Sequence, residues 1–317
     1  MGDGTAESDS QKRLGGIIPG TPGNHAFSLT GPEPSAIPVL IAVPHAGRAY
    51  PGSLLRALRD PESTALKLED RLVDRIGLAT AKETGATLLV ANAPRAMIDL
   101  NRSPDDVDWE MFECHQRPEN ARDNPSHRVR SGLGLIPRRV PGLGELWKRQ
   151  HQESDLTARI AGIHDPYHRT LSDALAEMRA RWGTVVLLDL HSMPPIQPRG
   201  VSRPPEFVIG DRFGESCHGS LVAATFSYFD EHGRSVAHNR PYSGGYVLQR
   251  HAAPRAGIYG IQLEIDRSIY LDNELTKPGS GFAATARLLS GLVLKMAAEV
   301  TLFGEAAGHA VWREAAE

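Results

Sequence analysis

Short apolar runs alternate with amphipathic stretches along most of this chain. Apolar and β-branched residues run together, as in buried strands, at 37–43, 87–91, 184–190, 207–210, 241–248 and 258–265. Apolar residues recur at a spacing of three or four, as on one helix face, at 66–83, 143–163, 167–182, 214–229 and 281–300. Strands that alternate with helices predict an α/β fold in which helices cover both faces of a mostly parallel sheet.

Two regions lack this periodicity. Residues 1–34 are rich in Gly, Pro, Ser and Thr, which predicts a loosely ordered leader ahead of a single catalytic α/β domain over residues 35–317. Charges, prolines and glycines dominate residues 103–141, as in a functional excursion, and the sequence leaves open whether they close over a substrate. Between the two middle helices, Asp165-Pro166 has the pattern of an N-cap followed by proline at the first helical position.

The composition narrows the class of protein. The chain has 317 residues, 40% hydrophobic and 23% charged, which is typical of a globular protein, and its net charge of −3 favours neither nucleic acid nor an anionic membrane as a partner. No apolar run approaches the roughly 18 residues of a membrane span, and residues 1–20 lack a secretory pattern. Cys114 and Cys217 fit free thiols in a reducing compartment, so we expect a cytoplasmic protein. The oligomeric state is not predicted.

Two histidines follow buried-strand patterns and are candidates for metal ligands. His45 follows the run 37–43 after a single residue, Pro44, and His191 comes directly after 184–190. In an open α/β sheet, ligands bind at the carboxyl ends of the strands. A catalytic zinc site needs about three protein ligands and an open position for water. The third ligand is Asp70 or Glu69, although acidic residues in a first helical turn are also favoured by the helix dipole alone.

Two carboxylates near these strands have alternative interpretations. Asp189 lies two residues before His191, so on a strand both side chains point to one face, where Asp189 either orients the imidazole or simply ends the strand. Glu264 lies in the run 258–265, on the face opposite Leu263. It is either on the solvated side of an edge strand or a general base held beside a metal-bound water.

Arginines and glycines supply candidates for substrate binding. Arg95 and Arg102 flank a short apolar segment, and each is either a carboxylate clamp or an ordinary surface arginine. The segment 241–246 contains Gly244 and Gly245, which either bring backbone N–H groups to a substrate or form a hairpin turn.

Taken in order, several segments resemble the N-formylglutamate amidohydrolase family over roughly residues 37–300. The matching segments are Val43-Pro44-His45-Ala46-Gly47, Tyr50-Pro51, Glu69-Asp70, Pro94-Arg95-Ala96-Met97-Ile98-Asp99-Leu100-Asn101-Arg102, Asp189-Leu190-His191-Ser192, Asn239, Pro241-Tyr242-Ser243-Gly244-Gly245-Tyr246 and Gln262-Leu263-Glu264. The family looks like a branch of the zinc carboxypeptidase and aspartoacylase group. The resemblance therefore implies a three-layer α/β/α sandwich with a central mixed, mostly parallel sheet.

The resemblance also implies roles for individual residues. It implies that Zn²⁺ is held by His45, Asp70 and His191, and that Glu264 is the general base and acid. It implies a substrate-binding set in which Arg102 takes a carboxylate: Arg95, Asn101, Arg102, Tyr242, Gly244 and Gly245. The chain departs from the His-x-x-Glu motif of the carboxypeptidases, because Arg48 stands three residues after His45. The carboxylate ligand must therefore come from elsewhere in the chain.

The expected activity is hydrolysis of N-formyl-L-glutamate to formate and L-glutamate. Two alternatives stay open at this point: hydrolysis of another N-acyl or N-formimidoyl amino acid or a small peptide, and binding of an amino-acid derivative without catalysis. In each case the expected partner is a small molecule, with neither nucleic acid nor membrane involved.

Overall fold

An eight-stranded mixed sheet forms the centre of the computed structural model, which describes residues 10–113, 126–197 and 203–314. In chain order the strands are β1 (Ser10–Gly15), β2 (Phe27–Pro32), β3 (Val39–Val43), β4 (Thr87–Ala91), β7 (Val185–Met193), β8 (Phe207–Gly210), β9 (Val236–His238) and β10 (Ile258–Asp266). Their order across the sheet is β1-β2-β4-β3-β7-β10-β8-β9. The four central strands β4, β3, β7 and β10 are parallel, whereas β1 and β2 at one edge and the β8–β10 pair are antiparallel.

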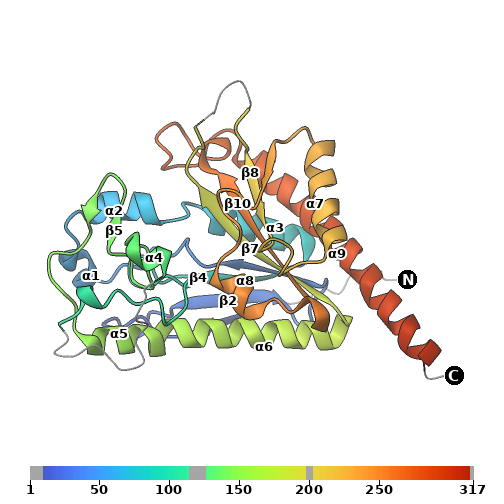
Figure 1. Cartoon of the computed structure of the whole chain (residues 1–317), viewed down its shortest axis with the longest axis horizontal. Coiled ribbons are helices and arrows are strands. Elements are labelled where there is room, and N and C mark those ends of the chain that lie inside the picture. The colour runs from blue at the N-terminus through green and yellow to red at the C-terminus, as the bar shows by residue number, and fades with distance from the viewer. Residues whose placement is uncertain (1–9, 114–125, 198–202, 315–317) are drawn as a thin grey trace, which may run out of the picture.

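Helices cover both faces of this sheet, so the predicted three-layer sandwich is confirmed (Figure 1). One face packs against α1 (Gly52–Ala57), α5 (Glu153–Arg159), α6 (Asp165–Trp182) and α8 (Tyr246–His251). The other packs against α3 (Val73–Thr84), α7 (Gly219–Glu231) and α9 (Phe282–Glu314). Strand β7 shows the alternation: Leu187 faces the α6 side and Leu188 the α3 side, and both are fully buried.

The remaining elements are short and lie mostly in the connections. They are α2 (Pro61–Leu68), α4 (His127–Arg130), β5 (Arg139–Val140), β6 (Gly144–Glu145), the π-helical turn η2 (Ile160–His164), and the 3₁₀ turns η1 (Trp109–Met111), η3 (Pro254–Ala256) and η4 (Arg267–Ile269). Within the described residues, no helix is both long and apolar enough to span a bilayer.

The prediction of a loose leader over residues 1–34 is wrong for the part that the structure describes. Strand β1 pairs with β2, and β2 pairs with β4 of the central sheet. In β2, Phe27 and Leu29 are buried and alternate with Ser28 and Thr30, a period of two that is too short to stand out among the surrounding glycines and prolines. A domain boundary at residue 35 is therefore wrong as well, and residues 1–9 lie outside the described residues.

Two of the helices predicted from the apolar periodicity differ in their bounds from the helices in the structure. The expected helix 66–83 is two helices, α2 and α3, separated by a break in which Leu72 has a left-handed φ of 60°. The expected helix 143–163 begins only at Glu153, and Asp165-Pro166 does not start a new helix, because the chain is helical without interruption through Trp182. Proline lacks an N–H and crowds the preceding turn, and the wider π turn η2 directly before it accommodates both effects.

The predicted strand 241–248 is also wrong. Residues 241–245 form a loop, Gly244 has a φ of 107°, and the chain then enters the helix α8 at Tyr246. By contrast, the predicted strands 87–91 and 207–210 have the observed bounds. Strand β7 runs three residues beyond its predicted end, so His191 lies within the strand rather than after it.

The contribution of the N-terminal strands can be measured with a matched pair of leucine variants. Leu29 in β2 is 3% exposed and Leu14 in β1 is 50% exposed. We expect Leu29→Ala to lower the free energy of unfolding by about 2–5 kcal/mol, because it empties a packed site, and Leu14→Ala to lower it by less than about 1 kcal/mol. Denaturant titration measures both values. Equal, small effects would mean that residues 10–34 do not belong to the folded core.

Candidate metal centre and active site

A backbone hydrogen bond between two irregular segments brings His45 and Asp70 together. His45 lies two residues after the last residue of β3, and its carbonyl accepts a hydrogen bond of 3.0 Å from the N–H of Asp70. Asp70 lies in the break between α2 and α3, where Glu69 is extended and Leu72 is left-handed. The break turns the Asp70 side chain toward the carboxyl end of the sheet instead of along a helix surface.

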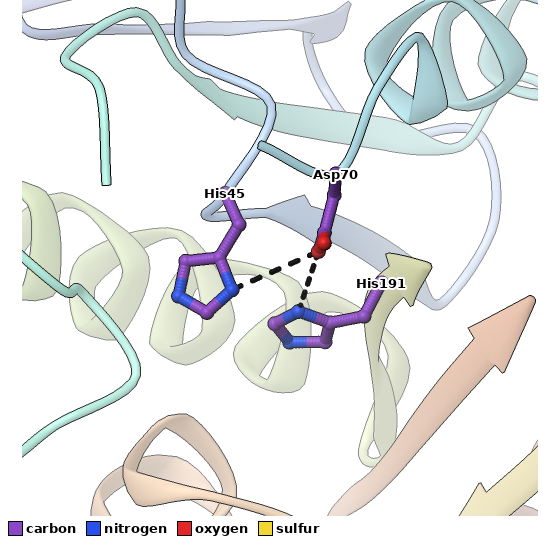
Figure 2. Close-up of side chains that lie close together, drawn as sticks. All are labelled: His45, Asp70 and His191. Atoms are coloured by element: carbon purple, nitrogen blue, oxygen red, sulfur yellow. Dashed lines mark hydrogen bonds and ion pairs between the residues drawn. The ribbon is translucent and has the colours of Figure 1, made fainter. Parts of the chain in front are cut away.

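His191 completes a compact group with these two residues, as Figure 2 shows. Its strand β7 is the parallel neighbour of β3, which places both histidines at the same region of the sheet. The Oδ2 atom of Asp70 lies 3.0 Å from Nδ1 of His191 and 3.7 Å from Nδ1 of His45. All three donor atoms lie within 4.8 Å of one another, and each residue is at most 3% exposed.

The chemistry of this group fits a bound zinc ion. Ligand atoms at 2.0–2.2 Å around a tetrahedral zinc are about 3.3 Å apart, close to the distances from Asp70 to the two imidazoles. Each ring has its other nitrogen on a carboxylate: Nε2 of His45 lies 2.7 Å from Asp99, and Nε2 of His191 lies 2.9 Å from Asp189. Such a carboxylate fixes the imidazole tautomer and leaves Nδ1 free to bind a metal. Asp189 therefore orients an imidazole and does not merely end the strand.

The electrostatics of the group also favour a cation. Burial by itself lowers the pKa of His191, but the carboxylates of Asp189 and Asp70 raise that pKa well above its ordinary value. Burial likewise works to raise the pKa of Asp70, yet its hydrogen bonds with His191 and His45 hold it well below the usual range. The site thus attracts positive charge to the space between the rings, whether a proton or a metal ion.

Glu69, the alternative carboxylate ligand, points elsewhere. Its Oε2 accepts a hydrogen bond of 2.7 Å from Nη1 of Arg71. Arg267, which sequence reasoning missed, supports the break instead: its Nη2 donates to the carbonyl of Glu69 at 2.6 Å and lies 3.4 Å from Oδ1 of Asp70. The only sequence signal for Arg267 is its position directly after β10.

Glu264 lies beside the histidine of the neighbouring strand. In the parallel pairing of β10 with β7 it is in register with His191, and the two side chains share one face. The solvated-edge interpretation is wrong, because β10 lies between β7 and β8 and Glu264 is 7% exposed. Burial raises the pKa of Glu264 to about 7, and the negative charge of Asp70 adds to this effect, whereas the charge of His191 opposes it. A carboxyl group with such a pKa exchanges protons readily near neutral pH.

Asn101 ties several of these elements together. Its Oδ1 accepts the N–H of Val247 at 2.8 Å, and its Nδ2 lies 3.3 Å from both Asp189 and Gln262. Gln262 in turn donates to Glu264 at 3.0 Å and accepts the N–H of Gly245 at 3.0 Å. The N–H of Gly245 is therefore engaged with Gln262, not turned to a substrate. Position 245 must also be occupied by glycine, because a Cβ there would lie 2.4 Å from the Asn101 amide.

A pocket of about 380 Å³ opens over this group. Its walls include Tyr242, Gly244 and a run of positively charged side chains, namely Lys67, Arg95, Arg102, Arg128 and Arg267. Among the described residues that line the pocket, the acidic side chains are those of Asp70 and Glu264. On a chain whose net charge is −3, this is a local concentration of positive charge, which favours an anionic ligand.

The two predicted arginines differ in how they are held. The Nε of Arg95 donates to Oδ2 of Asp99 at 2.9 Å. Arg102 donates to two backbone carbonyls, of Leu133 at 2.9 Å and Asn101 at 2.7 Å, while Asp99 is 4.0 Å away. Neither arginine is an ordinary surface residue. Because Arg102 has its closest bonds to neutral groups, its charge is less compensated than that of Arg95.

The family model for N-formylglutamate amidohydrolase matches residues 37–271, a span that contains every residue of the metal group and Glu264. This chain belongs to the N-formylglutamate amidohydrolase family. The family assignment agrees with the resemblance seen in the sequence motifs.

Individual members of the family resemble the chain over most of its length. N-formylglutamate deformylase of Pseudomonas aeruginosa is 28% identical over 245 residues, which is 75% of this chain and 84% of that protein. The protein of the same name from Pseudomonas putida is 28% identical over 74% of this chain and 82% of its own length. The crystal structure of N-formylglutamate amidohydrolase from Ralstonia eutropha JMP134 superimposes with a TM-score of 0.77 at 32% identity, covering 87% of this chain and 98% of that one.

The remaining sequence expectations concern the two cysteines and the segment 103–141. Cys217 is a free, buried thiol, and burial raises its pKa to about 12, so it is not a reactive nucleophile. Cys114 lies outside the described residues. Of the predicted excursion 103–141, the described part contributes Arg128, Leu133 and residues 140–141 to the pocket wall.

The choice between Asp70 and Glu69 as metal ligand can be tested by metal analysis. We expect Asp70→Asn to lose bound zinc, because an amide supplies no negative charge between the imidazoles, and Glu69→Gln to retain about one zinc per chain. Inductively coupled plasma mass spectrometry after dialysis measures the zinc content of both variants. Equal zinc content in the two variants, or loss only in Glu69→Gln, would contradict this ligand set.

Proposed function

We propose that this chain hydrolyses N-formyl-L-glutamate to formate and L-glutamate, with one Zn²⁺ held by His45, Asp70 and His191. The observation that carries the proposal is the meeting of these three donors beside a buried Glu264 in a cationic pocket. The names of the relatives from Pseudomonas and Ralstonia point to the same reaction.

Two nitrogen donors and one oxygen donor form the ligand set of a catalytic zinc site, in which a fourth position stays open. When bound, the metal lowers the pKa of a water molecule and polarises the carbonyl of the scissile amide. The role of His45, Asp70 and His191 is to hold it at the floor of the pocket. Asp99 and Asp189 hold the two rings in the orientation that this requires.

Glu264 is the proton carrier of the reaction. As the water oxygen bonds to the formyl carbon, Glu264 accepts a proton from that water, and as the C–N bond breaks it delivers the proton to the departing nitrogen. Formate and the free amine of glutamate leave, and Glu264 is again a carboxylate. The hydrogen bond from Gln262 fixes the carboxylate in place. Burial raises the pKa of Glu264 to about 7, and a cation held by the neighbouring ligands would oppose this shift and favour the carboxylate form that accepts a proton.

The positive wall of the pocket suits a substrate with two carboxylates. Arg102 is the main carboxylate ligand because its charge is the less compensated of the two predicted arginines. Arg95 contributes its charge from beside Asp99. Tyr242 supplies a neutral phenol, since burial raises its pKa and the charges of Glu264 and Asp70 raise it further. This charge distribution favours an acidic N-formyl amino acid over an apolar N-acyl amino acid or peptide.

Substitution of the base tests the catalytic step. We expect Glu264→Gln to keep its zinc and its fold but to lower kcat by about 10²–10⁴-fold, because an amide cannot accept the proton. Asp266→Asn is a matched control, since Asp266 is a buried carboxylate on the same strand that accepts the Ser268 N–H and does not line the pocket. Steady-state hydrolysis of N-formylglutamate is the measurement. A Glu264→Gln enzyme with kcat near that of Asp266→Asn would remove Glu264 from this role.

Substitution of Arg102 tests the recognition of substrate charge. We expect Arg102→Ala to raise KM for N-formyl-L-glutamate by roughly 10–100-fold, because a charge-assisted hydrogen bond to the substrate is lost. N-formylglutamate diamide, which carries no carboxylate, serves as the matched substrate, and its kcat/KM should change by less than about threefold. Equal losses with both substrates would show that Arg102 supports the fold of the pocket and does not bind substrate charge.

A further inference from the structure

Three buried histidines lie together beside residues 100–102 (the site segment), which include Asn101 and Arg102. They are His164 at the end of η2, His168 in α6 and His251 at the end of α8. His164 and His168 have no exposed surface, and His251 is 7% exposed. None of the three lines the pocket or belongs to the metal group. They contact neither the proposed zinc ligands nor Glu264 through any of their hydrogen bonds.

The hydrogen bonds of these histidines have fixed directions. Nε2 of His168 lies 3.0 Å from the carbonyl oxygen of Leu100, and Nε2 of His164 lies 3.0 Å from that of Arg102. A carbonyl oxygen can only accept, so both Nε2 atoms carry the proton. Nε2 of His251 lies 2.9 Å from Nδ1 of His168 and donates to it, because a neutral His168 protonated at Nε2 has an acceptor at Nδ1.

All three rings are neutral in this arrangement. Burial lowers the pKa of His164, lowers that of His168 well below its ordinary value, and lowers that of His251 to about 3, and the charge of Arg250 adds to the effect on all three. Each ring therefore has a single N–H, and His164 and His168 both donate theirs to the backbone of the site segment.

The two carbonyls that accept these bonds stand on either side of Asn101. The side chain of Asn101 reaches Asp189 and Gln262, and the side chain of Arg102 lines the pocket. His251, the bonding partner of His168, belongs to α8. The N–H of Val247 in the same helix donates to the side chain of Asn101. The histidines thus link α6 and α8 to each other, and both helices are hydrogen-bonded to the site segment.

We propose that His164 and His168 are positioning residues, which hold the backbone around Asn101 so that Arg102 presents its guanidinium to the substrate. They act through the segment 100–102 and touch no reacting atom. This proposal rests on the proposed function for its kinetic consequence, and on the hydrogen bonds alone for its structural one. Displacement of a substrate-binding guanidinium weakens its hydrogen bond to the substrate carboxylate, so the loss of either backbone bond reaches the active site as a higher KM.

The test compares glutamine with asparagine at each position. The amide nitrogen of glutamine can take the place of Nε2 and donate to the carbonyl, whereas that of asparagine ends near the position of Nδ1 and falls short. We expect His164→Asn to raise KM for N-formyl-L-glutamate roughly tenfold while kcat changes less than about threefold. We also expect faster hydrogen–deuterium exchange over residues 99–103. His164→Gln should stay close to the unchanged protein in both measurements, and the His168 pair should follow the same order.

Leu175→Ala controls for a general loss of stability. Leu175 lies in α6, is 1% exposed, and has an apolar side chain that makes none of these hydrogen bonds, so its truncation destabilises the helix and leaves the bonds themselves intact. The proposal is overturned if glutamine and asparagine behave alike at both positions, or if Leu175→Ala raises KM as much as His164→Asn does. Failure of the unchanged protein to hydrolyse N-formyl-L-glutamate would refute the proposed function, while the exchange measurement would still decide whether the histidines hold the segment.

Discussion

The mutual approach of His45, Asp70 and His191 is the constraint on which the rest of the site depends. Carboxylates are unfavourable in a protein interior unless positive charge or hydrogen bonds compensate them. Several carboxylates are buried in and around this group, among them Asp70, Asp99, Asp189 and Glu264. Arg95 compensates Asp99, and Arg267 approaches Asp70 only at 3.4 Å. In the proposed function, a divalent cation between the imidazoles would supply the positive charge that this concentration of carboxylates requires.

The fold provides this geometry through strand order. The adjacent parallel strands β3 and β7 deliver the two histidines, and β10 on the far side of β7 delivers Glu264 in register with His191. Asp70 comes instead from the connection between two helices, and its position needs the break between α2 and α3. The site is therefore built on rigid elements, with one irregular segment that is itself held by the carbonyl of His45 and by Arg267.

The sequence predicted the parts of this site that follow from local pattern. An apolar run followed by a histidine predicts a buried strand that carries a side chain near its carboxyl end. His45 lies two residues beyond the end of β3, and His191 lies within the last three residues of β7. Alternation along 258–265 placed Glu264 on the correct face. The break in the helix at 69–72 was not predicted, because the residues on both sides continue the same apolar spacing. A residue with a left-handed backbone conformation, such as Leu72, does not change the spacing of the apolar residues.

Partners that depend on tertiary contact were not predictable either. Asp99 holds His45 across 54 positions of sequence, and Arg267 reaches Asp70 across 197. The helix at 246–251 was mistaken for a strand because its first residues are aromatic and β-branched, which favour strands locally. The histidines of α6 and α8 gave no signal at all, since neither spacing nor composition distinguishes a buried histidine from a surface one.

The most direct test of the central claim is a crystal structure of the zinc-loaded protein, with anomalous diffraction measured on both sides of the zinc edge. The account predicts one strong anomalous peak about 2.0–2.2 Å from Nδ1 of His45, Nδ1 of His191 and a carboxylate oxygen of Asp70. A peak at any other group of residues, or coordination through the Nε2 atoms that face Asp99 and Asp189, would contradict it.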